Sequence, residues 1–298
     1  MKKNICLILI ILSSLNLSLA QEWMTSLKVA KRLALVQDKM IFAMWEESTY
    51  YPFPVQLDDN KGNLIITDLF EDDAINKILW EYFVPVKISE YEYEDLFNPI
   101  KDKRSSNYIS KFNDDSIKIL DANGNIFNVH DQNVSVLNLS EFINKYAINI
   151  TFLKGNLTMY DERKNFTSSL RLAMKLFDFA IFNRKSIKNE IIDLANIYLN
   201  EAQELLLQSD EIKKESFSQM CDLNRLKSHL ILNKPKKLLR VLKKIDAADI
   251  DSSNVALYSF LNYTANKLLK KEKNSEIWKN QISLVDLKKA QLIINSNK

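Results

Sequence analysis

The chain has 298 residues, of which 46% are hydrophobic and 27% are charged, and it carries a formal net charge of +3. A chain of this length buries a large core, and about two domains is the natural expectation. Its nearly neutral charge gives no reason to expect nucleic acid or an anionic membrane as a partner.

The first twenty residues have the features of a cleavable signal peptide. Lys2 and Lys3 form a basic start, an apolar run extends from Ile5 to Leu12, and Ser18-Leu19-Ala20 places small residues where a signal peptidase cleaves. We therefore predict residues 1–20 as a signal peptide, cleavage after Ala20, and a periplasmic or secreted protein. The apolar run is shorter than the roughly 20 residues of a membrane span, so no integral membrane segment is expected after cleavage.

Cleavage would remove Cys6 and leave Cys221 as the single cysteine of the mature chain. A lone cysteine cannot form an internal disulfide, so the fold must hold without one even in an oxidising compartment. The mature chain therefore cannot carry out dithiol–disulfide exchange on its own.

Helical and strand patterns alternate after the signal peptide. Apolar residues recur every three or four positions from Trp23 to Ala34, which predicts a helix with one apolar face. The run Lys39–Trp45 predicts a strand buried on both faces. A polar and aromatic loop is expected from Glu46 to about Gly62, a second helix around Glu71–Tyr82, and another strand over Phe83–Ile88.

A hairpin and a closing helix are predicted next. Two short apolar strands, 116–120 and 126–129, flank Asp121-Ala122-Asn123-Gly124-Asn125, and Asn-Gly is a strong signal for a tight turn. A helix from about Leu139 to Tyr146 would complete an α/β region that ends near residue 150.

Only helical patterns follow. The predicted helices cover about 170–182, 187–205, 210–232 and 236–245, and a final pair covers 257–268 and 277–290. Short polar breaks between them imply antiparallel neighbours, so this part is similar to an array of helical hairpins of the tetratricopeptide type, although no fixed period is present. The predicted domains are residues 21–150, an α/β domain, and residues 151–298, an all-α array.

The order of elements in residues 22–148 resembles the thioredoxin-like fold. Lys39–Trp45 resembles the first core strand of exported members of that family, Phe83–Ile88 resembles the next strand, and Ile117–Asn125 resembles the terminal hairpin. The resemblance covers a little under half of the mature chain. It implies an α/β thioredoxin-like N-terminal domain in front of the helical array.

Both parts of that family's redox site are missing. Its members carry Cys-x-x-Cys after the first core strand, where a helix N-terminus lowers the thiol pKa. Here the matching loop reads WEESTYYPFP, from Trp45 to Pro54, without cysteine. The family's cis-proline before the hairpin is replaced by Asn113-Asp114-Asp115. We therefore expect a non-enzymatic protein.

The loop after the first core strand is the candidate binding surface. Its aromatic residues are Trp45, Tyr50, Tyr51 and Phe53. Such side chains anchor partner peptides, although they also pack beneath long loops. The expected function is an adaptor that holds an envelope or periplasmic protein. The alternatives are a thiol–disulfide oxidoreductase-like activity, through Cys221 or a partner's thiol, and a peptide-binding chaperone.

Other reactive residues form no recognisable motif. Ser48 and Thr49 would need a base and an orienting group to act as nucleophiles, and neither His130 nor His229 lies in such a motif. Gly124 occupies the fourth rather than the sixth position of a calcium-type loop, so a hairpin turn is the better interpretation. We expect no catalytic residue, no metal site and no cofactor.

Two charged segments remain. Basic side chains gather between Lys234 and Lys244, and acidic residues alternate with tyrosines over Glu90–Asp95. Both are interpreted as solvated faces, with an acidic partner for the basic helix left open. Cys221 lies in an apolar helical pattern and is expected to be a small core residue.

Overall fold

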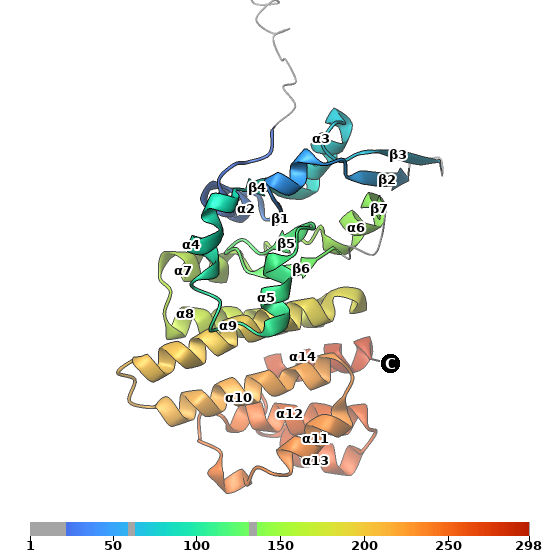
Figure 1. Cartoon of the computed structure of the whole chain (residues 1–298). Helices are drawn as coiled ribbons and strands as arrows, with labels where there is room; N and C mark the ends of the chain where they lie inside the picture. The colour runs from blue at the N-terminus through green and yellow to red at the C-terminus, as the bar shows by residue number, and fades with distance from the viewer. Residues whose placement is uncertain (1–21, 59–62, 131–135, 298) are drawn as a thin grey trace, which may run out of the picture.

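The computed structural model describes residues 22–58, 63–130 and 136–297, so the predicted signal peptide lies outside the described residues. Figure 1 shows a mixed α/β region followed by a stack of helices. The strands are β1 Met40–Trp45, β2 Pro54–Asp58, β3 Leu64–Asp68, β4 Phe83–Ile88, β5 Lys118–Leu120, β6 Ile126–Val129 and β7 Leu137–Asn138.

Helices cover this region and build the rest of the chain. In the α/β region they are α2 Leu27–Gln37, α3 Asp73–Tyr82, α4 Tyr93–Phe97, α5 Ser106–Asn113 and α6 Leu139–Tyr146, with short 3-10 turns η1 Glu47–Tyr50 and η2 Glu90–Glu92. The following helices are α7 Lys154–Glu162, α8 Phe166–Phe182, α9 Lys188–Gln208, α10 Lys214–Ile231, α11 Pro235–Leu242, α12 Val255–Leu268, α13 Glu272–Lys279 and α14 Leu284–Ser296, with 3-10 turns at Lys185–Ile187 and Ala247–Asp249.

The main sheet has the strand order β4-β1-β5-β6. β1 runs parallel to β4 and antiparallel to β5, and β6 returns antiparallel to β5. The connection from β1 to β4 includes α3, as a parallel pair requires a crossover. A second, smaller sheet has the order β3-β2-β7.

β1 lies inside the main sheet, between β4 and β5, and all six of its side chains are buried. Successive side chains of a strand point to opposite faces, so Phe42 and Trp45 face different layers. The Phe142 ring of α6 lies 5.8 Å from the Phe42 ring, and the Phe112 ring of α5 lies 5.5 Å from the Trp45 ring. This confirms the predicted buried strand and explains its continuous apolar sequence.

Pro85 is compatible with β4 because its nitrogen faces away from β1. The Met24 N–H donates to the Pro85 carbonyl at 3.0 Å, and the Lys87 N–H donates to the Met24 carbonyl at 2.9 Å. The Pro85 nitrogen points to that same outer edge, where the missing N–H costs the β1–β4 pairing nothing. Met24 therefore continues the sheet by one bridge beyond β4.

Three predictions about elements were wrong. The first helix begins only at Leu27, because the Ser26 hydroxyl caps it, and Trp23 lies before it. The described part of the expected loop 46–62 contains η1 and β2, while Gly62 lies outside the described residues. The expected helix 277–290 is two helices, because Ser283 caps the start of α14.

The hairpin turn predicted at residues 121–125 is present, and it joins the α/β region to the helices. Asp121 Oδ1 accepts the backbone N–H groups of Asn123 at 3.0 Å and Asn125 at 2.8 Å, and Gly124 takes the left-handed φ of +89°. The Tyr198 hydroxyl of α9 donates to Asp121 Oδ2 and accepts from Asn123 Nδ2 at 3.2 Å. The turn is therefore fixed to α9 by buried hydrogen bonds.

A second set of polar contacts crosses the same junction. The Tyr160 hydroxyl of α7 donates to Glu201 of α9, and Arg104 lies 3.9 Å from that carboxylate. The predicted boundary near residue 150 falls between α6 and α7, and the buried core continues across it. Among residues 22–58, 63–130 and 136–297, none of the helices combines the length and the apolar composition of a membrane crossing.

Candidate functional site

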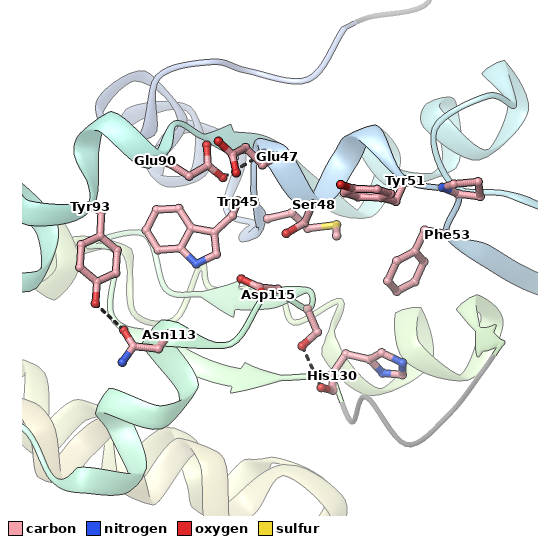
Figure 2. Close-up of a pocket in the computed structure, with 13 residues that line it drawn as sticks. Trp45, Glu47, Ser48, Tyr51, Phe53, Glu90, Tyr93, Asn113, Asp115 and His130 are labelled. Atoms are coloured by element: carbon pink, nitrogen blue, oxygen red, sulfur yellow. Dashed lines mark hydrogen bonds between the residues drawn. The ribbon is translucent and has the colours of Figure 1, made fainter.

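A cavity of about 520 Å³ opens at the carboxyl end of β1, where the loops after β1, after β4 and before β5 meet. Figure 2 shows Trp45 and Tyr93 on one side of it, Tyr51 and Phe53 on the other, and Asp115 and His130 below. We refer to this cavity as the aromatic cavity. It contains three of the four aromatic residues predicted to bind a partner.

Trp45 is a fixed wall of the aromatic cavity. Its side chain is only 5% exposed, and its indole N–H donates to the Phe112 carbonyl at 3.3 Å. The ring meets the Phe112 ring edge-on and lies 5.8 Å from the Tyr93 ring. Trp45 therefore shapes the cavity from a packed position.

The neighbouring tyrosines Tyr50 and Tyr51 differ in their relation to the cavity. Both are exposed, at 70% and 72%, but only Tyr51 lines the cavity. The 3-10 turn η1 ends at Tyr50, and Tyr51 is already extended, so the chain changes direction between them. Phe53 also lines the cavity, where its ring packs 6.3 Å from the His130 ring. Sequence reasoning grouped all four aromatics, and Tyr50 does not join the others.

The rest of the lining includes residues that the sequence did not single out as binding residues. The Tyr93 hydroxyl donates to Asn113 Oδ1 at 2.8 Å, and the Ser116 hydroxyl donates to the His130 carbonyl at 3.0 Å. Asp115 lies between Asn113 and Ser116 in the sequence and faces the same cavity. The one available signal was the segment 113–115, which replaces the proline of the thioredoxin-like pattern.

The charged residues that line the aromatic cavity are all acidic. Glu47, Glu90 and Asp115 contribute carboxylates, and no lysine or arginine is among the described residues that line it. Glu90 is held in place because its carboxylate accepts the Glu47 N–H at 2.9 Å. Across the described residues, no group of three or more His, Cys, Asp or Glu side chains is arranged to hold a metal ion. The cavity thus offers apolar walls with a negative rim.

Lys118 holds the loop of residues 113–116 in place beside this cavity. Its side chain is 2% exposed, and its ammonium donates to the carbonyls of Asp114 and Ser116, the latter at 3.4 Å. The same ammonium lies 5.4 Å from the centre of the Trp45 ring. Burial lowers the pKa of Lys118 to about 8, against the opposing effect of Asp114 and Asp115. Lys118 therefore holds the 113–116 loop next to Trp45.

Of the remaining reactive residues, Ser48 and His130 both line the aromatic cavity, whereas Thr49 and His229 do not. Ser48 lines the cavity, whereas the Thr49 hydroxyl donates to the Glu46 carbonyl at 2.7 Å. The His130 ring packs between the rings of Phe53 and Phe142, and His229 is on α10 in the helical half. Sequence reasoning placed both histidines outside any motif, and the structure places them in different parts of the molecule, His130 after β6 and His229 within α10.

Cys221 is completely buried in α10. Burial raises the pKa of its thiol to about 11, with a smaller contribution from Asp222. At neutral pH only about one thiol in ten thousand would be the reactive thiolate. Cys221 is therefore a small core residue, as its apolar helical pattern predicted.

The fold and the site together define an α/β region followed by helices, with a cavity of about 520 Å³ at the carboxyl end of the parallel strand pair β1 and β4. Comparison of the chain with protein-family models, with curated proteins and with solved structures returned no match.

Proposed function

We propose that residues 21–150 form a thioredoxin-like domain that has lost its redox residues, in an exported protein with a helical, loosely tetratricopeptide-like second part. The support for the first part is the main sheet, in which a parallel pair is followed by an antiparallel hairpin and a closing helix. This is the element order that the sequence resemblance implies. The export signal rests on the sequence of residues 1–20 alone.

We propose further that the protein is an adaptor that binds a peptide segment of an envelope or periplasmic protein in the aromatic cavity. The observation that carries this proposal is the cavity itself, which lies where the family's active site would be and has aromatic walls in place of thiols. Its negative rim favours a segment with lysine or arginine beside an apolar residue, because opposite charges steer and orient association. The apolar residue would contact Tyr51 and Phe53.

The buried state of Cys221 weighs against a thiol-based enzyme. An attacking thiolate must reach a disulfide sulfur, and this thiol has neither exposure nor a lowered pKa. The adaptor is therefore the function that the geometry supports best.

Two adjacent tyrosines provide the test. Peptides are selected from a displayed library on the protein, and their affinities are measured by titration calorimetry for wild type, Tyr51→Ala and Tyr50→Ala. We expect Tyr51→Ala to weaken binding about tenfold or more, since an aromatic anchor that becomes covered by the partner dominates binding energy. Tyr50→Ala is the matched control, because this residue is equally exposed but does not line the cavity.

Selected peptides should carry a positive charge beside an apolar residue. If the two tyrosine variants weaken binding equally, or if the library yields no peptide that binds wild type, the aromatic cavity is not the binding site.

A further inference from the structure

The helical half contains a second groove, of about 810 Å³, formed by α11, α12 and α13. Figure 1 shows these helices together in the C-terminal part of the molecule. No residue lines both this groove and the aromatic cavity, so the two sites are separate.

The floor of this groove is apolar. Leu242 and Tyr258 are buried there, and the Trp278 ring meets the Tyr258 ring edge-on at 5.5 Å. Ile277 lines the same groove yet remains 71% exposed. An exposed aliphatic side chain next to an aromatic floor provides contact area for an apolar side chain of a partner.

Two buried asparagines of α12 add polar groups to the lining. Asn262 Nδ2 donates to the Tyr258 carbonyl at 3.1 Å, and Asn266 Nδ2 donates to the Asn262 carbonyl at 2.8 Å. These hydrogen bonds hold both amides in place on the helix. Fixed amides of this kind pair well with the backbone of a bound peptide, because each amide carries both donors and acceptors.

A basic rim surrounds the floor, formed by Lys236, Arg240, Lys243 and Lys271. The first three are spaced by four and three residues, so they lie on one side of α11 and its last turn. Within the described part of the chain, none of the four forms an ion pair with a carboxylate. Asp246 is the one acidic residue among the described residues of the lining.

We propose that this groove binds an acidic segment of a partner protein in which apolar side chains lie between the carboxylates. The carboxylates would neutralise the basic rim, and the apolar side chains would cover Ile277 and the floor. A nucleic acid would use the rim for its phosphates but would leave Ile277 without an apolar contact. The groove therefore fits an acidic peptide better than an oligonucleotide.

Two double variants with the same change in charge test this proposal. Arg240→Glu/Lys243→Glu reverses two charges of the basic rim. Lys237→Glu/Lys244→Glu reverses two charges of the same segment that do not line the groove. The probe is a fluorescein-labelled peptide, EELFEELFEELF, titrated with the full mature chain and followed by fluorescence anisotropy. Circular dichroism confirms that each variant is folded.

We expect the rim variant to bind this peptide about tenfold or more weakly than wild type, and the control variant to stay within about twofold. Ile277→Ser should also weaken binding while leaving its salt dependence unchanged, because the floor contributes apolar contact. An equal loss in both double variants would show a response to overall charge and would overturn the proposal. Tighter binding of a twelve-residue oligothymidylate, or no binding of the peptide by wild type, would overturn it as well.

Discussion

Lys118 is the residue whose position is physically most demanding. Its ammonium is removed from water and lies against the backbone carbonyls of Asp114 and Ser116 and the Trp45 ring. Desolvation therefore exceeds the compensating interactions and lowers its pKa to about 8. This unfavourable burial occurs where Lys118 holds the 113–116 loop of the aromatic cavity in place.

The lowered pKa of Lys118 predicts a pH dependence of stability. Between about pH 8 and the ordinary lysine value of 10.5, the unfolded chain binds more protons at this position than the folded chain. The contribution of Lys118 therefore becomes more favourable as pH rises through this window, by on the order of 3 kcal/mol.

Urea unfolding of wild type and Lys118→Met, at several pH values from 7 to 10.5, measures this contribution. The difference between the two free energies of unfolding should change in favour of wild type as pH rises, and other titrating groups cancel in that difference. A difference that stays constant over this range would mean that Lys118 is not desolvated in the folded protein.

Residue identity alone could not separate Tyr50 from Tyr51. The two have the same side chain, and only the end of η1 between them decides which one faces the cavity. Such a backbone detail has no signature in a loop read as polar and aromatic. Trp45 could be located because it ends a continuous apolar run, which indicates burial directly.

Among the helices and strands, the buried ones were easier to predict from the sequence than the exposed ones. β1 and α8 were foreseen because a continuous or all-round apolar pattern is typical of an element enclosed by others. β3 was missed because its side chains Leu64, Ile65 and Ile66 are all exposed at the edge of the smaller sheet, so no alternation distinguishes an inner face. α4 and α5 were missed because they have only five and eight residues, which is too few for a helical period to stand out.

The turn between β5 and β6 depends on α9 through the Tyr198 hydroxyl. Tyr198→Phe removes this group and leaves the buried Asp121 carboxylate without its partner from α9. We expect a loss of about 1–3 kcal/mol in the free energy of unfolding at pH 7, which is the usual cost of a buried polar group deprived of a hydrogen bond.

This loss should be smaller at acidic pH. Burial already raises the pKa of Asp121, and the bond from Tyr198 opposes that rise, so its removal raises the pKa further. The penalty is therefore largest where Asp121 is ionised and decreases once it is protonated. Urea unfolding at pH 7 and pH 4 tests this, with Tyr91→Phe, on a side chain that is 98% exposed, as a control that should change neither value.

At the scale of the whole molecule, the continuous core and the polar junction predict one cooperative unfolding transition. Trp23, Trp45 and Trp80 lie in the α/β region, and Trp278 lies in α13. In a Trp278→Phe variant, fluorescence therefore reports on the α/β region, whereas far-UV circular dichroism reports mainly on the helices.

The two signals should give the same midpoint in urea, because coincident transitions are the mark of a two-state protein. Two midpoints separated beyond experimental error would show that the predicted domains 21–150 and 151–298 unfold independently. Domains in chains of this size often unfold independently, so the measurement shows whether the polar junction couples the unfolding of the two predicted domains.

The hydrogen bonds that hold the 121–125 turn against α9 also bear on the distance between the two proposed binding sites. They join the region of the aromatic cavity to α9, and α9 packs against α10, which contacts α11 and α12 of the groove, so we expect the protein to act as a rigid spacer between two bound segments. A rigid spacer gives one effective concentration for partners whose binding segments match its length, and almost none for partners whose segments cannot reach. Partner choice would then depend on geometry as well as on side-chain chemistry.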